Sequence, residues 1–169
     1  MQVPPPYRVT VVCLGNICRS PLGEVVLRDR VERAGLAGRV LVDSAGTGDW
    51  HIGHDADPRA REVAAARGYP MDHRARQITD AWFDDLDLVI AMDASNYADL
   101  QRMLARSGAD AEVRMMRSFD PSLAHLEEPH PDLEVPDPYY GTPEDFVTVL
   151  RMLERASDGL VAELPRRLA

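Results

Sequence analysis

Lysine is absent from the 169-residue chain, so all 19 basic residues are arginines. This absence excludes enzymes that form a Schiff base through a lysine, pyridoxal enzymes among them, and it excludes phosphate loops of the Walker type, which depend on a lysine. A composition with arginine as the sole basic residue and abundant alanine is typical of a GC-rich bacterial genome.

Long apolar runs are also absent. No stretch reaches the roughly 18 uncharged apolar residues of a membrane span, and the opening MQVPPPYR does not continue into an apolar targeting segment. We therefore expect a cytoplasmic protein without a membrane span. The length and the 45% hydrophobic content predict a single domain over residues 1–169, with residues 1–6 as a disordered leader.

Positive charge and cysteine are both scarce. The net charge is −9, and no arginine occurs between Ser118 and Leu150, which excludes a non-specific nucleic-acid surface. The two cysteines, Cys13 and Cys18, are too few for a disulfide framework and have no nearby histidine for a zinc site. Chemistry at a thiol is the interpretation that remains.

Apolar runs alternate with helical patterns along the chain. Strands are predicted at residues 7–14, 40–43, 86–92 and 111–116. Helix starts are predicted at Ser20-Pro21, Asp57-Pro58, Asp93 or Ser95, and Thr142-Pro143. Because strands separated by single helices need crossover connections, we expect an α/β fold: a Rossmann-like three-layer sandwich with a central four-stranded parallel sheet and helices on both faces.

Ligands of such sheets bind at the carboxyl ends of the strands, and the first predicted strand ends at Cys13. A second feature is the segment from Pro121 to Pro138, which contains five prolines and is predicted to be a long ordered loop. Long ordered loops are usually functional.

The segment CLGNICRSP, from Cys13 to Pro21, joins the first strand to the first helix. Backbone N–H groups at a helix start, together with the helix dipole, form an anion site and favour a thiolate at Cys13. Gly15 and Asn16 tolerate positive φ in a tight turn. Arg19 offers a planar fork that matches two phosphoryl oxygens. The phosphate-binding residues are predicted to be Leu14, Gly15, Asn16, Ile17, Cys18, Arg19 and Ser20.

CLGNICRSP resembles the signature of the low-molecular-weight protein tyrosine phosphatases, in their bacterial, actinobacterial-type form. The resemblance implies a phosphatase in which Cys13 attacks phosphorus and forms a phosphocysteine intermediate. A thiolate that expels an aryloxide needs a proton donor. The resembling family carries its general acid in a DPY segment, which here is Asp137 in the stretch Asp137-Pro138-Tyr139-Tyr140.

The resemblance also implies the surroundings of the site. Trp50, Tyr139 and Tyr140 would form aromatic walls for a phosphotyrosine ring, although a lone tryptophan such as Trp50 is often a core residue. A polar network of Asn16, Ser20, Ser44 and His73 would support the phosphate loop. Cys18, in the same short loop as Cys13, is a candidate for redox protection of the nucleophile.

No cofactor or metal is expected. His51 and His54 have the spacing of a metal pair but lack a third ligand, so we interpret them as solvated loop residues. The expected partners are proteins that contain phosphotyrosine, and a bacterial tyrosine kinase would be the enzyme that modifies them.

Three alternatives remain at this point. An arsenate reductase of the same fold would need further cysteines to relay oxidation, and none follows Cys18. A protein arginine phosphatase resembles this chain but has a threonine at the position of Ile17. A non-catalytic phosphopeptide-binding module would need neither the thiol nor Asp137.

Overall fold

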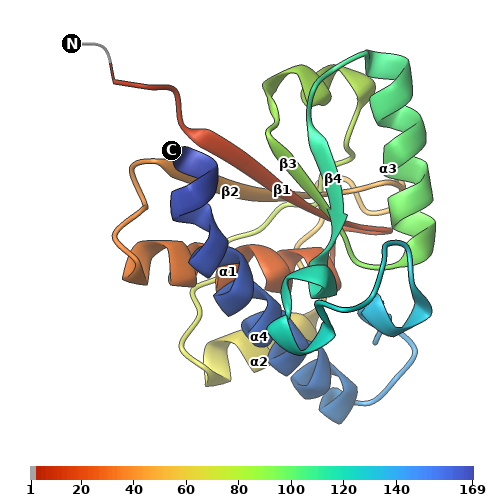
Figure 1. The fold of residues 1–169 in the computed structure, drawn as a ribbon. Coiled ribbons are helices and arrows are strands. Elements are labelled where there is room, and N and C mark those ends of the chain that lie inside the picture. Colours follow the sequence, from red (N-terminus) through yellow and green to blue (C-terminus); the bar gives the residue numbers. More distant parts are fainter. Residues whose placement is uncertain (1–2) are drawn as a thin grey trace.

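A computed structural model describes residues 3–169. Its centre is a parallel sheet of four strands, β1 (Tyr7–Cys13), β2 (Val40–Gly46), β3 (Leu88–Ala91) and β4 (Glu112–Met115), in the order β2-β1-β3-β4 (Figure 1). Strand β2 continues three residues beyond its predicted end at Asp43, because Ser44, Ala45 and Gly46 still pair with the end of β1.

Helices cover both faces of the sheet, which confirms the predicted three-layer sandwich (Figure 1). The helices are α1 (Arg19–Arg33), α2 (Pro58–Ala66), α3 (Ala94–Ser107) and α4 (Pro143–Leu168), with a short 3-10 helix η1 at Asp80–Asp85. Val9 and Val11 of β1 pack in the core with α1, α2 and α4, whereas the intervening Val12 packs in the core with α3 and η1. This alternation is that of a strand buried on both faces.

Three of the four predicted helix starts are capped as their sequences suggest. The Asp57 carboxylate caps α2, the Asp93 carboxylate caps α3, and Thr142 forms a capping box with Asp145 at α4. The prediction for α1 was wrong. The helix begins at Arg19, and Ser20 lies inside its first turn, because the Ser20 hydroxyl is bonded to Cys13 and Asn16 instead of capping the helix.

The predicted long loop is held by buried side chains. It contains two short 3-10 helices, η3 (Pro121–Leu123) and η4 (Pro131–Leu133). A third, η2 (Met116–Phe119), directly precedes it. Leu133 and Val135 are fully buried, and the Val135 N–H donates to the carbonyl of Met92 at the end of β3. The loop is therefore fastened to the carboxyl edge of the sheet.

The first residues of the chain add little to the layers. Residues 3–6 precede β1 without regular secondary structure, and the rest of the predicted leader, residues 1–2, lies outside the described residues. Within residues 3–169, none of the helices combines the length and the apolar character needed to cross a membrane.

The strand order places Cys13 where the sheet topology reverses. The chain leaves β1 toward β2 on one side and then returns to β3 on the other side. The carboxyl end of β1 is consequently a switch point, the usual ligand position in sheets of this type.

Candidate active site

The loop after β1 turns its carbonyl groups into the protein and leaves its amides unbonded. The carbonyls of residues 13, 14, 16 and 17 accept hydrogen bonds, respectively, from Thr47 N, Gly48 N, His73 Nε2 and Asp57 N. Within the part of the chain that the structure describes, the N–H groups of residues 14–18 donate to no other protein group. A loop of amides held in this way, at the start of α1, is a site for an anion.

Asn16 connects this loop to the surrounding polar network. Its φ of 56° is in the left-handed region, where asparagine is tolerated better than most residues. Its Nδ2 donates to Ser20 Oγ at 2.8 Å and to Ser44 Oγ at 3.0 Å, while its Oδ1 accepts from the Arg76 N–H. His73 Nε2 lies 2.6 Å from the Asn16 carbonyl, so the structure brings all four residues of the expected network into contact.

The network ends at the thiol. The Ser20 hydroxyl oxygen lies 3.0 Å from Cys13 Sγ and farther, at 3.3 Å, from the Ala45 carbonyl. Because Asn16 already donates to this hydroxyl, the hydroxyl proton is available to a thiolate at Cys13. A hydrogen bond of this kind favours the charged form of the acceptor.

Two glycines allow other segments to approach the loop closely. A Cβ at Gly46 would lie 2.7 Å from the Leu14 carbonyl oxygen, so β2 ends directly against the loop. Gly15 does not have the positive φ that we expected. In the loop of residues 14–18, the residue with a positive φ is Asn16. The absence of a side chain at Gly15 instead makes room for His51, whose Cδ2 would lie 3.1 Å from a Cβ there.

Arg19 is buried, with 3% of its surface exposed. Its Nη1 donates to Asp93 Oδ2 at 2.8 Å and to the Val135 carbonyl at 3.0 Å, and its Nη2 lies 3.8 Å from Asp137 Oδ2. Burial opposes the charge of the guanidinium, but the negative charges at Cys13, Asp93 and Asp137 outweigh it and raise the pKa of Arg19. The Arg19 guanidinium is thus held through Nη1 by Asp93 and Val135, and it also lines the cavity.

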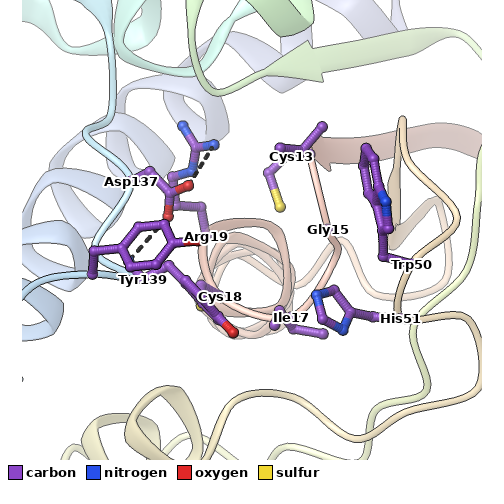
Figure 2. A pocket seen from close by; sticks show the side chains of 11 residues that line it. Cys13, Gly15, Ile17, Cys18, Arg19, Trp50, His51, Asp137 and Tyr139 are labelled. Carbon is purple, nitrogen blue, oxygen red and sulfur yellow. Dashed lines mark hydrogen bonds and ion pairs between the residues drawn. The ribbon is translucent and has the colours of Figure 1, made fainter.

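These groups surround a cavity of about 340 Å³. In Figure 2, Cys13 lies at the centre, with Asp137, Tyr139 and Arg19 on one side and Trp50 and His51 on the other. Trp50 is 67% exposed and is therefore not a core residue. Tyr139 and Tyr140 meet edge to face, with ring centroids 4.8 Å apart. The lining residues are Cys13, Leu14, Gly15, Ile17, Cys18, Arg19, Trp50, His51, Asp137, Tyr139 and Tyr140.

Cys18 lies in the same cavity wall but differs from Cys13 in its surroundings. It is buried, with 4% of its surface exposed, and burial, followed by the charges of Asp57, Cys13 and Asp137, raises the pKa of its thiol. Cys18 is accordingly a neutral thiol at physiological pH. Both cysteines are free, so no disulfide joins them in this structure.

Sequence reasoning missed several residues of the site. His51, interpreted as a solvated loop residue, is half-buried and lines the cavity, whereas His54 is exposed as expected. Asp93 was predicted only as a helix cap, and Glu24, whose carboxylate accepts from Ser44 Oγ at 2.7 Å, was not considered at all. Asp93 and Glu24 are far in the sequence from their partners, Arg19 and Ser44, so no local pattern marks these contacts.

Comparisons with known proteins give one consistent answer. The family model of low molecular weight phosphotyrosine protein phosphatases matches residues 8–169. A low molecular weight protein-tyrosine-phosphatase of Streptomyces coelicolor is 52% identical over 92% of each chain. Low molecular weight protein-tyrosine phosphatase A of Mycobacterium tuberculosis is 46% identical over 97% of this chain and 95% of its own.

Solved structures share the fold. The crystal structure of a protein tyrosine phosphatase from Entamoeba histolytica superimposes with a TM-score of 0.83 at 34% identity, over 95% of this chain and 98% of that one. The sequence match over nearly the whole length and the shared fold lead to the same assignment. The chain belongs to the low molecular weight phosphotyrosine protein phosphatase family.

Proposed function

We propose that the protein is a cysteine-dependent tyrosine phosphatase that hydrolyses phosphotyrosine in proteins through a phosphocysteine intermediate. The observation that carries the proposal is the loop of residues 14–18, whose amides are unbonded while its carbonyls are held by the surrounding frame. These amides and Arg19 surround the place where a phosphoryl group would lie against Cys13 Sγ.

In the first step, Cys13 Sγ attacks phosphorus and the bond from phosphorus to the phenolic oxygen breaks. Asp137 gives its proton to that oxygen, because an aryloxide leaves poorly without one. In the second step, Asp137 removes a proton from water, the water oxygen attacks phosphorus, and the bond from sulfur to phosphorus breaks. Inorganic phosphate is released and both side chains return to their starting forms.

The cavity walls support an aromatic substrate. Trp50 and His51 on one side and Tyr139 on the other leave a gap into which the Cys13 sulfur points (Figure 2). A phosphotyrosine side chain is long enough to bring its phosphoryl group to the loop while its ring lies between these walls, and stacking contributes about 0.5–1.5 kcal/mol beyond burial. A bacterial tyrosine kinase would supply such substrates.

The proposal is tested with a phosphotyrosine peptide and the phosphoserine peptide of otherwise identical sequence. The wild-type protein should release phosphate from the first much faster than from the second. Cys13→Ser should abolish turnover but still bind phosphate or vanadate, because the loop amides and Arg19 are retained. Turnover of more than a few per cent in Cys13→Ser would refute the role of the thiol.

A further inference from the structure

Arg59, in the first turn of α2, is hydrogen-bonded to the loop that carries Asp137. Its Nη2 donates to the Tyr139 carbonyl at 2.8 Å and its Nη1 to the Gly141 carbonyl at 3.3 Å. We call residues 136–142 the acid loop. Two carbonyls of this loop, one on each side of Tyr140, are therefore held by a single guanidinium from another element.

The guanidinium is itself fixed. Its Nε lies 3.1 Å from Asp57 Oδ1 and its Nη2 lies 3.0 Å from Asp57 Oδ2, a two-pronged contact that raises the pKa of Arg59. It also stacks on the Phe146 ring, 4.6 Å from the centroid. A planar group with an ion pair on one edge and a ring beneath it loses little further freedom when it binds two carbonyls.

The segment from Asp57 to Arg59 also contacts the loop of residues 14–18 that follows Cys13, which we call the nucleophile loop. The Asp57 N–H donates to the Ile17 carbonyl at 2.8 Å, while the Asp57 side chain holds Arg59. The contacts run from the loop of Cys13 through Asp57 and Arg59 to the acid loop. The elements concerned lie together, since α2 packs against both α1 and α4 (Figure 1).

Other attachments of the acid loop lie at its ends. Before it, Val135 is bonded through its N–H to Met92 and through its carbonyl to Arg19. At its last residue, the capping box of α4 fixes Thr142. Of the residues that the structure describes, Arg59 is the one outside the loop and α4 that donates side-chain hydrogen bonds to the backbone between 137 and 141.

We infer that Arg59 is a positioning residue for the proton donor: it sets the place of Asp137 relative to Cys13 by holding the acid loop against the nucleophile loop. The inference rests on the proposed function, since it assumes that Asp137 is the acid. The Asp137 carboxyl is 47% exposed, lies 3.8 Å from Arg19 Nη2 and accepts a hydrogen bond at 3.1 Å from the Tyr139 N–H of its own loop. Its position therefore depends on the backbone that carries it. A misplacement of about 1 Å can lower a rate by about 10²-fold.

The test compares Arg59→Met with Arg61→Met. Methionine keeps an apolar stem over Phe146 but removes the donors. Arg61 lies two positions farther along the same helix and is bonded to the Ala56 carbonyl, not to the acid loop. Both variants lose one positive charge. For phenyl phosphate, whose leaving group needs a proton, kcat/KM should fall about 10- to 100-fold in Arg59→Met and less than about 2-fold in Arg61→Met.

For p-nitrophenyl phosphate, whose phenolate leaves readily, kcat/KM in Arg59→Met should fall only a few-fold. The ratio kcat/KM reports the first step, whereas kcat also contains the hydrolysis of the phosphocysteine, which is the same for both substrates. A purely structural defect would lower both substrates alike. Amide hydrogen exchange gives a readout that does not depend on activity: exchange at Tyr139 and Gly141 should become faster in Arg59→Met and stay at the wild-type rate in Arg61→Met.

Asp137→Asn is the reference that separates the two claims. If Asp137→Asn discriminates between the leaving groups but Arg59→Met does not, the inference about Arg59 is wrong and the proposed function stands. If neither variant discriminates between the leaving groups, Asp137 is not the acid, and both the proposed function and the inference about Arg59 are wrong. The double variant gives a final check, because Arg59→Met should add almost nothing to the loss for phenyl phosphate once Asp137 is already asparagine.

Discussion

The two carboxylate oxygens of Asp93 have different partners. Oδ2 accepts a hydrogen bond from Arg19 Nη1 at 2.8 Å, whereas Oδ1 accepts from the Asn96 N–H at 2.7 Å and caps helix α3. A residue at the end of β3 thus orients the arginine of the anion site and begins the next helix. The two roles can be separated by substitution.

Asp93→Asn should keep the cap and lose the partner of Arg19, because the amide retains an acceptor for Asn96 but has no charge for the guanidinium. Asp93→Ala loses both. We expect kcat/KM for a phosphotyrosine peptide to fall more than tenfold in each variant, and Asp93→Ala to be less stable than Asp93→Asn by about 1 kcal/mol, the usual contribution of a cap. Urea unfolding and steady-state kinetics measure the two effects. Asp99→Asn, whose carboxylate pairs with Arg102 in the same helix, is the control.

Asn16 allows a second separation, between backbone strain and side-chain bonding. Both Asn16→Gly and Asn16→Ala remove the donors to Ser20 and Ser44 and should lose most activity. Glycine accepts a φ of 56° without strain, whereas alanine does not. The free energy of unfolding of Asn16→Ala should therefore be lower than that of Asn16→Gly by about 1–2 kcal/mol. Equal stabilities in urea unfolding would show that the loop relaxes to another conformation.

Most of the architecture could be predicted because its signals are local. The buried strand that ends at Cys13, the Asp57-Pro58 start of α2 and the box at Thr142 each depend on residues within one or two turns. The start of α1 could not be predicted in this way. Ser20 is a good capping residue, but its hydroxyl is taken by a contact within the phosphate loop that no helix pattern encodes.

In the candidate site, too, the residues in local motifs could be predicted and the residues in long-range contacts could not. CLGNICRSP and the DPYY stretch are contiguous motifs, so the residues that line most of the cavity were found. Asp93 lies 74 positions from Arg19, and Arg59 lies 80 positions from Tyr139. Aspartate and arginine are common on helix starts and helix surfaces, and a sequence gives no indication of which of them the fold brings to the site.

The pH dependence of stability should be visible at Glu112. The hydrogen bond from Arg167 is the main cause that lowers the pKa of the Glu112 carboxyl from its ordinary value of 4.5. A carboxyl with a lowered pKa contributes stability above its unfolded value, and this contribution is lost as the pH falls through the folded pKa. Wild-type protein should therefore lose stability below about pH 4.5 more steeply than Glu112→Gln. Parallel curves from chemical unfolding at a series of pH values would contradict this prediction.

Cys18 bears on the response of the site to oxidation. Peroxide reacts with thiolates. Cys13 is the thiolate nucleophile of the proposed mechanism, whereas burial raises the pKa of Cys18 and keeps it neutral. Peroxide should convert Cys13 to a sulfenic acid first. The Cys18 sulfur can then attack the Cys13 sulfur to form a disulfide, with loss of water, before a second oxidation makes the damage irreversible.

We therefore predict that peroxide inactivates the wild-type protein reversibly and Cys18→Ser largely irreversibly. Each protein is compared with its own untreated activity, so that any effect of the substitution on turnover cancels. After a brief peroxide exposure followed by dithiothreitol, the wild type should recover most of its activity and Cys18→Ser only a small part. Mass spectrometry before reduction should find a disulfide between Cys13 and Cys18 in the wild type and a Cys13 sulfinic acid in the variant. Equal recovery in both proteins would remove the protective role and leave Cys18 as a packing residue beneath the phosphate loop.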